Sequence, residues 1–151
     1  MSLAVDVAAD GVRLPVARER IAALVRGVLR AEKIADAMIS VAFVDERAIA
    51  KLNRRHLGHA GATDVISFGF VPSGPRAPIV GDVYICPAVA RENAAREGVG
   101  VREELQRLVV HGTLHVLGHD HPEGDDRLAS PMWRRQEQLL RRLAPPRGRS
   151  A

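Results

Sequence analysis

Four of the six histidines in this chain lie within a run of eleven residues that begins at His111. On a helix, residues four apart lie on the same face, so His111 and His115 can present two imidazoles to one ion. Gly118 then lets the chain turn back and bring His121 to the same point. His119 is out of phase with these three, and we expect it at the surface or behind the ligands. The spacing predicts one Zn²⁺ ion on three histidines, with an open fourth position that is typical of a catalytic site.

The spacing H-x-x-x-H-x-x-G-x-x-H equals that of the zinc-binding segment of metzincin peptidases. Those enzymes place a glutamate after the first histidine as the general base, but this chain has Gly112 there. RNA carries its own nucleophile, the 2′-hydroxyl, and a metal can stabilise charge on phosphate oxygens. The substitution therefore favours another reaction over peptide hydrolysis. A minimal zincin-type metallopeptidase remains an alternative.

The histidines need a helix and a scaffold to position them. Apolar residues at helical intervals and the stop at Gly118 predict a helix over 101–117. Alternating or β-branched runs predict strands, and further apolar periodicity predicts more helices. The expected strands are 3–9, 38–44, 64–68 and 79–86, and the other expected helices are 16–30, a short one capped by Asp45, 87–97 and 132–143. We expect a polar loop at 54–61 and a hairpin loop at 72–78.

Composition predicts one domain and an interaction with a polyanion. The 151 residues are 46% hydrophobic, enough for a single core, and we assign 1–143 to the domain and 144–151 to a basic disordered tail. Aromatic residues make up only 3%, so contact with RNA would depend on charge and shape rather than on stacking. Six arginines against Glu137 in 134–151 suit a polyanion, although a solvated helix face explains them equally well.

The only cysteine, Cys86, excludes an internal disulfide and a cysteine-rich metal site, and it is expected in the core. The N-terminus lacks a basic leader followed by an apolar run. No apolar stretch approaches the roughly 20 residues needed to cross a bilayer. We therefore expect a cytoplasmic protein with no membrane association.

The histidine segment resembles the signature of the YbeY family, H-G-x-L-H-L-x-G-Y-D-H, with Val116 in place of a leucine and His119 in place of the tyrosine. The resemblance extends over nearly the whole chain. It also covers Leu52-Asn53, 63–68, 81–83, and Met132 with Glu137. It implies an α+β fold with a small mixed sheet of about four strands flanked by helices, a zincin-like helix and a zinc-dependent single-strand endoribonuclease. The implied role is maturation of the 3′ end of small-subunit ribosomal RNA and ribosome quality control, with small-subunit ribosomal proteins as further partners.

The resemblance also suggests catalytic residues. The family carries an arginine in the loop before the Thr-Asp-Val segment, where this chain has His56-Leu57. We hypothesise that Arg55 substitutes for it, against the alternative that it simply faces solvent. Asp64 and Ser67 belong to a strand that the family places beside the zinc cleft, so either could orient water or substrate. The alternative for Asp64 is a hydrogen bond at a turn or strand end.

Three further residues have two interpretations each. Met132 could lie beneath the metal or be a buried residue at a helix start, and Asp120 could accept a ligand imidazole N–H or cap the backbone. Asp82 is expected to be structural. Leu57 in place of the arginine leaves a third functional alternative, a non-catalytic ribosome-assembly factor whose fold zinc stabilises and whose basic C-terminus docks on RNA or a ribosomal protein.

Overall fold

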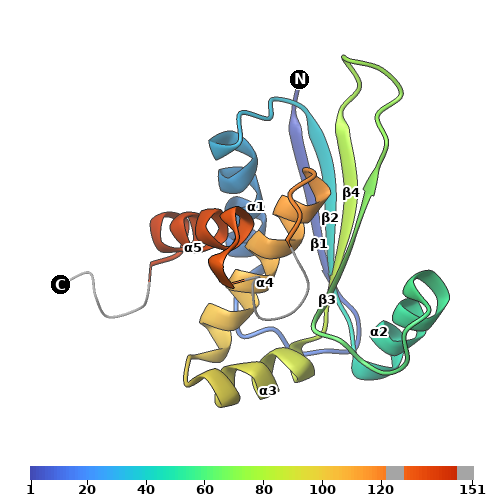
Figure 1. Cartoon of the computed structure of the whole chain (residues 1–151), viewed down its shortest axis with the longest axis vertical. Helices are drawn as coiled ribbons and strands as arrows, with labels where there is room; N and C mark the ends of the chain where they lie inside the picture. The colour runs from blue at the N-terminus through green and yellow to red at the C-terminus, as the bar shows by residue number, and fades with distance from the viewer. Residues whose placement is uncertain (122–127, 146–151) are drawn as a thin grey trace.

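The computed structural model describes residues 1–121 and 128–145, and it is built around a four-stranded sheet (Figure 1). The strand order is β1-β2-β4-β3, in which β1, β2 and β4 run parallel and β3 pairs antiparallel with β4 at the edge. The strands are β1 (Leu3–Ala9), β2 (Ala37–Phe43), β3 (Val65–Phe70) and β4 (Ile79–Ile85). The expected α+β fold with a mixed sheet of about four strands is confirmed.

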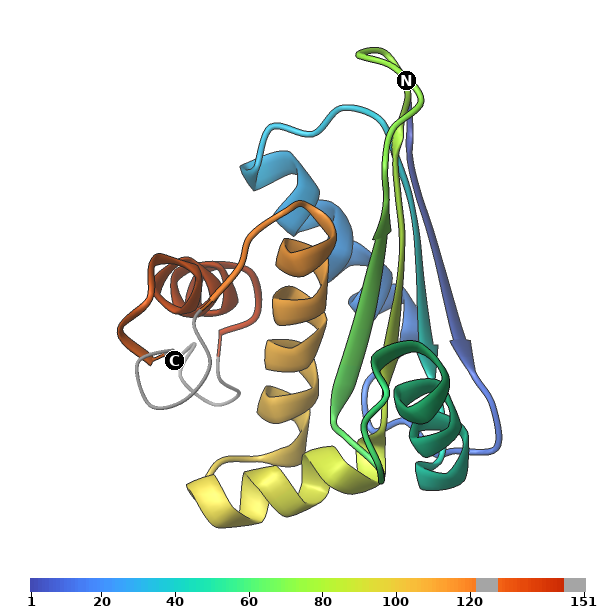
Figure 2. The ribbon, with the colours of Figure 1, turned by 45° about the vertical axis from the view of Figure 1, so that its right-hand side comes forward.

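The helices cover the two faces of the sheet unequally (Figure 2). We call the near face the one covered by α1 (Arg18–Ala31), α4 (Val101–Val116) and α5 (Pro131–Leu143), and the far face the one on which α2 (Glu46–Leu52) and its continuation lie. Helix α3 (Pro87–Glu97) crosses one end of the sheet and packs against α4. No helix among the described residues is long and apolar enough to cross a membrane.

The burial pattern follows from the two periodicities of the sequence. On β2 the alternate residues Ala37, Ile39, Val41 and Phe43 are buried on the near face. Helix α1 buries five apolar residues at helical spacing against them, from Ile21 to Leu29. Together with α4 and α5 these residues form the main core, so the histidine helix is packed between a sheet and two other helices.

One predicted loop is wrong in part, because α2 continues into a π-helical turn, η1 (Asn53–Leu57), where the sequence predicted a polar loop at 54–61. Asn53 is buried, and its side-chain amide donates a hydrogen bond to the Gly61 carbonyl at 3.0 Å, which holds the turn against the loop that follows. Gly58 ends the turn at φ 69°, a left-handed conformation that glycine adopts readily. Of the predicted disordered tail, Ala144 and Pro145 are described, and 146–151 lie outside the described residues.

Candidate metal centre

The three histidines predicted as ligands converge. His111 and His115 lie one turn apart on α4, and His121 follows the turn beyond that helix. One ring nitrogen from each lies within 4.8 Å of the others, and the three ring centroids are 4.7 to 5.3 Å apart. This cluster could hold a metal ion.

The turn after α4 brings the third histidine back. The Gly118 and His119 amides donate to the carbonyls of His115 and Leu114 at 3.0 Å, which closes the end of the helix. Gly118 has φ 98°, where a side chain would be strained, so a glycine is needed here. Asp120 accepts a hydrogen bond from the His121 amide at 2.9 Å, as expected if it caps the backbone.

The electrostatics of the cluster favour an uncharged His115. Burial, followed by the proximity of His111 and His121, lowers the pKa of His115 from 6.5 to about 4. His115 is therefore neutral at neutral pH, which is the form that binds a metal. Three imidazole nitrogens suit a transition metal, whereas Ca²⁺ and Mg²⁺ prefer oxygen ligands. The residues present thus fit the metal that the sequence pattern predicts.

Helix α5 supplies the support behind His111. Gln136 is buried, and its Oε1 lies 2.6 Å from His111 Nδ1. Met132 and Gln136 line a small cavity together with His111 and His121, so the buried methionine lies next to the ligands. Sequence reasoning missed Gln136. The available signal was a polar residue on the otherwise apolar stripe of α5.

His119 fixes the turn from outside the triad, consistent with its being out of phase. Its Nε2 lies 2.5 Å from Glu32 Oε1 at the end of α1, and Glu32 Oε2 accepts from Arg135 Nε of α5 at 2.9 Å. Burial alone would raise the pKa of Glu32, but the hydrogen bonds from His119 and Arg135 hold it below its usual value. Three segments distant in sequence are thereby tied beside the ligand turn.

Ser67 lies on the strand that packs against the histidine helix. A Cβ on Gly112 would lie 2.5 Å from Val83 Cγ1 and 3.5 Å from Val65 Cγ2, and one on Gly69 would lie 3.0 Å from the Val116 carbonyl oxygen. Because alternate residues of a strand share a face, Ser67 faces α4 between these two contacts. It is half-buried there, on the same side of the sheet as the three histidines.

The other two predicted catalytic residues lie elsewhere. Asp64 accepts hydrogen bonds from the Val65 amide at 2.8 Å and from the Asn93 amide of α3 at 2.9 Å, so it fixes the start of β3. Arg55 is exposed on η1, and the neighbouring His56 of η1 lies edge-on to Phe68, which packs with the far-face cluster. The structure therefore brings Ser67 to the near face with the histidines, whereas Asp64 occupies a strand end and Arg55 the far face.

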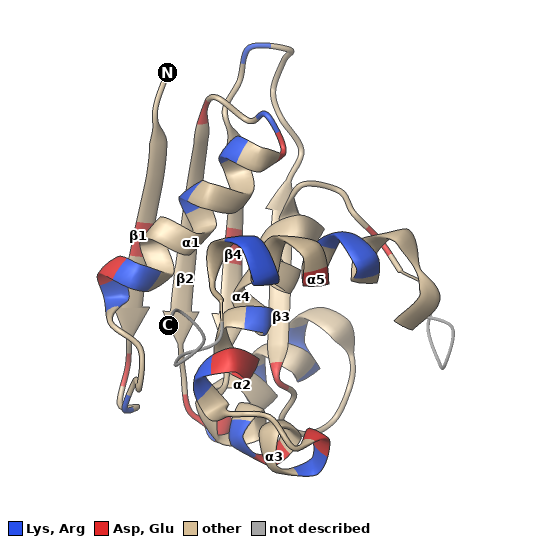
Figure 3. Cartoon of the chain, turned by 90° about the vertical axis from the view of Figure 1, so that its left-hand side faces the viewer, with Lys and Arg blue, Asp and Glu red and all other residues tan. Residues whose placement is uncertain are grey.

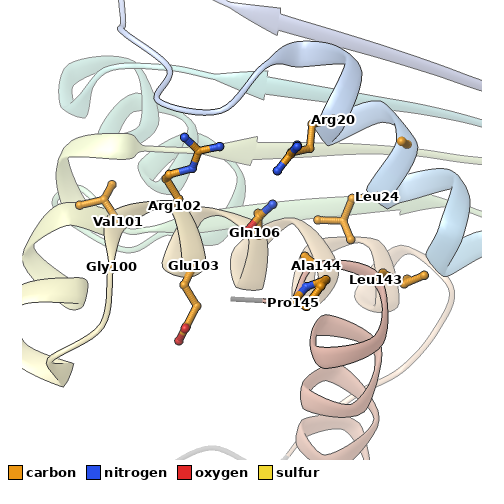
Figure 4. A pocket seen from close by; sticks show the side chains of 11 residues that line it. Arg20, Leu24, Gly100, Val101, Arg102, Glu103, Gln106, Leu143, Ala144 and Pro145 are labelled. Carbon is orange, nitrogen blue, oxygen red and sulfur yellow. The ribbon is translucent and has the colours of Figure 1, made fainter. Parts of the chain in front are cut away.

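Basic residues lie along α1 and α5 (Figure 3). On α5, Arg134, Arg141 and Arg142 are exposed. A larger cavity of about 740 Å³ lies at the other end of α4, where Arg20 of α1 and Arg102 of α4 extend toward one another (Figure 4). None of the three clustered histidines lines this cavity, so it is separate from the candidate metal centre.

Comparisons with known proteins place this chain in a family. The family described as endoribonuclease YbeY matches residues 8–144. The chain is 39% identical over 146 residues to an endoribonuclease YbeY from Thermobifida fusca, covering 91% of this chain and 92% of that protein. It is 39% identical to one from Frankia alni, covering 91% and 81% respectively. The solution structure of a Thermotoga maritima protein superposes with a TM-score of 0.61 at 25% identity, covering 92% of this chain and 88% of that one.

Proposed function

This chain belongs to the YbeY endoribonuclease family, and from that premise we propose that it cleaves single-stranded RNA with one zinc ion held by His111, His115 and His121. The observation that carries the proposal is the convergence of three imidazoles within 4.8 Å in a chain that matches the family from residue 8 to residue 144. The family membership supports the endoribonuclease activity. The three imidazole ligands support the assignment of zinc.

Zinc is the proposed ion because it favours tetrahedral sites with imidazole ligands, and three protein ligands leave one position for water or substrate. When bound, zinc acts as a Lewis acid that polarises a phosphate oxygen and lowers the pKa of a bound water. The chain's own contribution is to hold three imidazoles close together at the end of a packed helix. The lowered pKa of His115 keeps protons from competing for its nitrogen near neutral pH.

The packing of Gly112 favours the nuclease over the metallopeptidase alternative. A peptidase of this motif needs a carboxylate directly after the first histidine. Here that position is buried against the sheet, and even a Cβ would lie 2.5 Å from Val83 Cγ1. A glutamate side chain would enter the sheet contact rather than reach the histidines.

Three further residues are proposed to help with substrate. Ser67 is the best placed, because it faces α4 and can offer a hydroxyl to a phosphate or a water. Arg55 is proposed to bind a phosphate of the RNA where the RNA passes the edge of the sheet. Asp64 is proposed to act through β3, since its hydrogen bonds to Val65 and Asn93 set the strand's position.

The exposed arginines of α5 supply positive charge for the RNA backbone. The cellular substrate is proposed to be ribosomal RNA, with processing of the small-subunit RNA at its 3′ end, in the cytoplasm and with small-subunit ribosomal proteins as partners. The domain is proposed to span 1–143 with a basic tail beyond it. The competing proposal is an assembly factor that binds RNA without cutting it.

Elemental analysis of the purified protein and of His115→Ala, with cleavage of a single-stranded RNA assayed on the same samples, tests the proposal. We expect about one zinc per chain in the wild type, and loss of both zinc and cleavage in the variant. His59→Ala, in an exposed loop, is the matched control and should keep both. Zinc without metal-dependent cleavage would favour the assembly factor, and no metal in the wild type would overturn the site.

A further inference from the structure

Gln136 links the candidate metal ligands to a partly buried ion-pair network. Only 1% of its surface is exposed. Its Oε1 lies 2.6 Å from His111 Nδ1, and its Nε2 donates to Glu137 Oε2 at 3.0 Å. The amide is therefore engaged at both ends, and each end faces a different chemical group.

The partner of the nitrogen end is an ionised carboxylate. Burial alone would raise the pKa of Glu137, but hydrogen bonds from Arg107 and Gln136 hold it below the usual value. A carboxylate in this state can only accept hydrogen bonds. The NH₂ of Gln136 must therefore face Glu137, and the carbonyl oxygen must face His111.

Arg107 fixes Glu137 in turn. Its Nε donates to Glu137 Oε2 at 2.9 Å and its Nη2 to Oε1 at 3.1 Å, a two-point contact from a planar donor. The same guanidinium binds Glu103 and Glu104 on α4, which holds it in place. An ordered series of contacts thus runs from Arg107 through Glu137 and Gln136 to His111.

We infer that Gln136 is a positioning residue that holds His111 with its proton on Nδ1 and its Nε2 lone pair directed to the metal, an inference that rests on the proposed function. Because the amide oxygen accepts, Nδ1 must donate, and only Nε2 is left as a ligand atom. An amide orients the ring without adding negative charge to the centre.

The test measures both the tautomer and the metal affinity. Two-bond ¹H–¹⁵N correlation spectra of the metal-free ¹⁵N-labelled protein report which nitrogen of His111 is protonated, and competition with a chelator reports zinc affinity. Gln136→Met removes the acceptor at similar volume. Gln106→Met makes the same change on α4 at a half-buried position outside the network, so it is the matched control.

We expect a protonated Nδ1 in the wild type and in Gln106→Met. In Gln136→Met the Nε2–H form should appear and zinc should bind roughly 10- to 100-fold more weakly. Glu137→Gln replaces the carboxylate that fixes the orientation of the Gln136 amide, so it should give a mixture of His111 tautomers. This variant replaces Gln136→Met in the test if Gln136→Met does not fold.

An unchanged tautomer in Gln136→Met would overturn the inference, even if zinc affinity fell, because the effect would then be merely structural. Zinc affinity within twofold of the wild type would also overturn it. A wild type that binds no zinc would overturn the proposed function instead. The two failures are distinguishable because the tautomer is read on metal-free protein.

Discussion

The two faces of the sheet hold their functional candidates in different ways. On the near face His111 and His115 sit on a helix that packs in the main core, and His121 follows the turn beyond that helix, with side chains at the end of α1 and on α5 bonded to this segment. On the far face Arg55 sits on a single turn of π-helix over a cluster of four buried residues, Val44, Ile49, Ile66 and Cys86. One face positions its side chains through packing, and the other leaves its cation exposed.

This difference matches two kinds of chemistry. A metal ligand must be held to a fraction of an ångström, which needs locked rotamers and a second layer of hydrogen bonds. A cation that contacts a flexible phosphate backbone needs charge and reach more than a fixed position. The comparison predicts that changes in the near-face core lower stability more than matched changes on the far face, whereas loss of the exposed far-face cation lowers substrate binding.

Gly112→Glu should have the largest effect. It forces a Cβ against Val83 and buries a carboxylate without a partner, so we expect a loss of more than about 4 kcal/mol in the free energy of unfolding, measured by urea denaturation. Gly100→Glu is the control, because a Cβ there meets nothing within 4 Å. A stable Gly112→Glu protein with peptidase activity would contradict the packing account and revive the peptidase alternative.

Leu114→Ala and Ile49→Ala compare the two faces directly, since both side chains are fully buried. A buried Leu→Ala or Ile→Ala change usually lowers the free energy of unfolding by about 2–5 kcal/mol. The loss for Leu114→Ala should lie near the top of this range, because the large core around it cannot close the cavity. Ile49→Ala should lie near the bottom, since its small cluster can relax toward the surface. Urea denaturation measures both, and equal losses would remove the proposed contrast.

Acid should destabilise the metal-free protein through the near face. The pKa of His115 is about 4 when folded and 6.5 in a free chain, so the unfolded state takes up the proton first. Stability is therefore full above pH 6.5 and declines as the pH falls to 4, by roughly 1–2 kcal/mol, because solvent screens the half-exposed imidazole. Urea unfolding of chelator-treated protein across this window measures the loss. His115→Gln should flatten the dependence, whereas His59→Gln should leave it unchanged.

Arg55→Ala should have the smallest effect on stability, within about 0.5 kcal/mol, because the side chain is exposed. If Arg55 binds a phosphate, the rate of single-stranded RNA cleavage at limiting substrate should fall roughly tenfold. Arg47→Ala, also exposed on the far face, is the matched control and should leave the rate unchanged. An unchanged rate in Arg55→Ala would sink the hypothesis that it replaces the family's arginine.

The sequence predicted best what depends on local geometry. The spacing of His111 and His115 and the glycine turn are set within eleven residues, so the convergence with His121 follows from helix periodicity and the turn at Gly118. The strands and helices were also recovered to within a few residues, because their apolar periods are strong.

What the sequence could not supply depends on contacts between distant segments. Gln136 meets His111 across 25 residues, and Glu32 meets His119 across 87, so neither pairing leaves a local pattern. The position of Arg55 depends on how η1 docks on the sheet, where His56 lies edge-on to Phe68 at 5.0 Å. That docking replaced the first part of the predicted loop with a helical turn on the far face.

The close packing of Gly112 against Val83 also limits how this enzyme can evolve. The motif is one substitution away from a peptidase sequence on paper, but the intermediate would have to fold with a carboxylate inside the contact with Val83. A smaller residue at position 83 would have to come first, and it would cost core packing before giving any benefit. The order of mutations is therefore constrained, and a change from nuclease to peptidase activity would pass through a less stable intermediate variant.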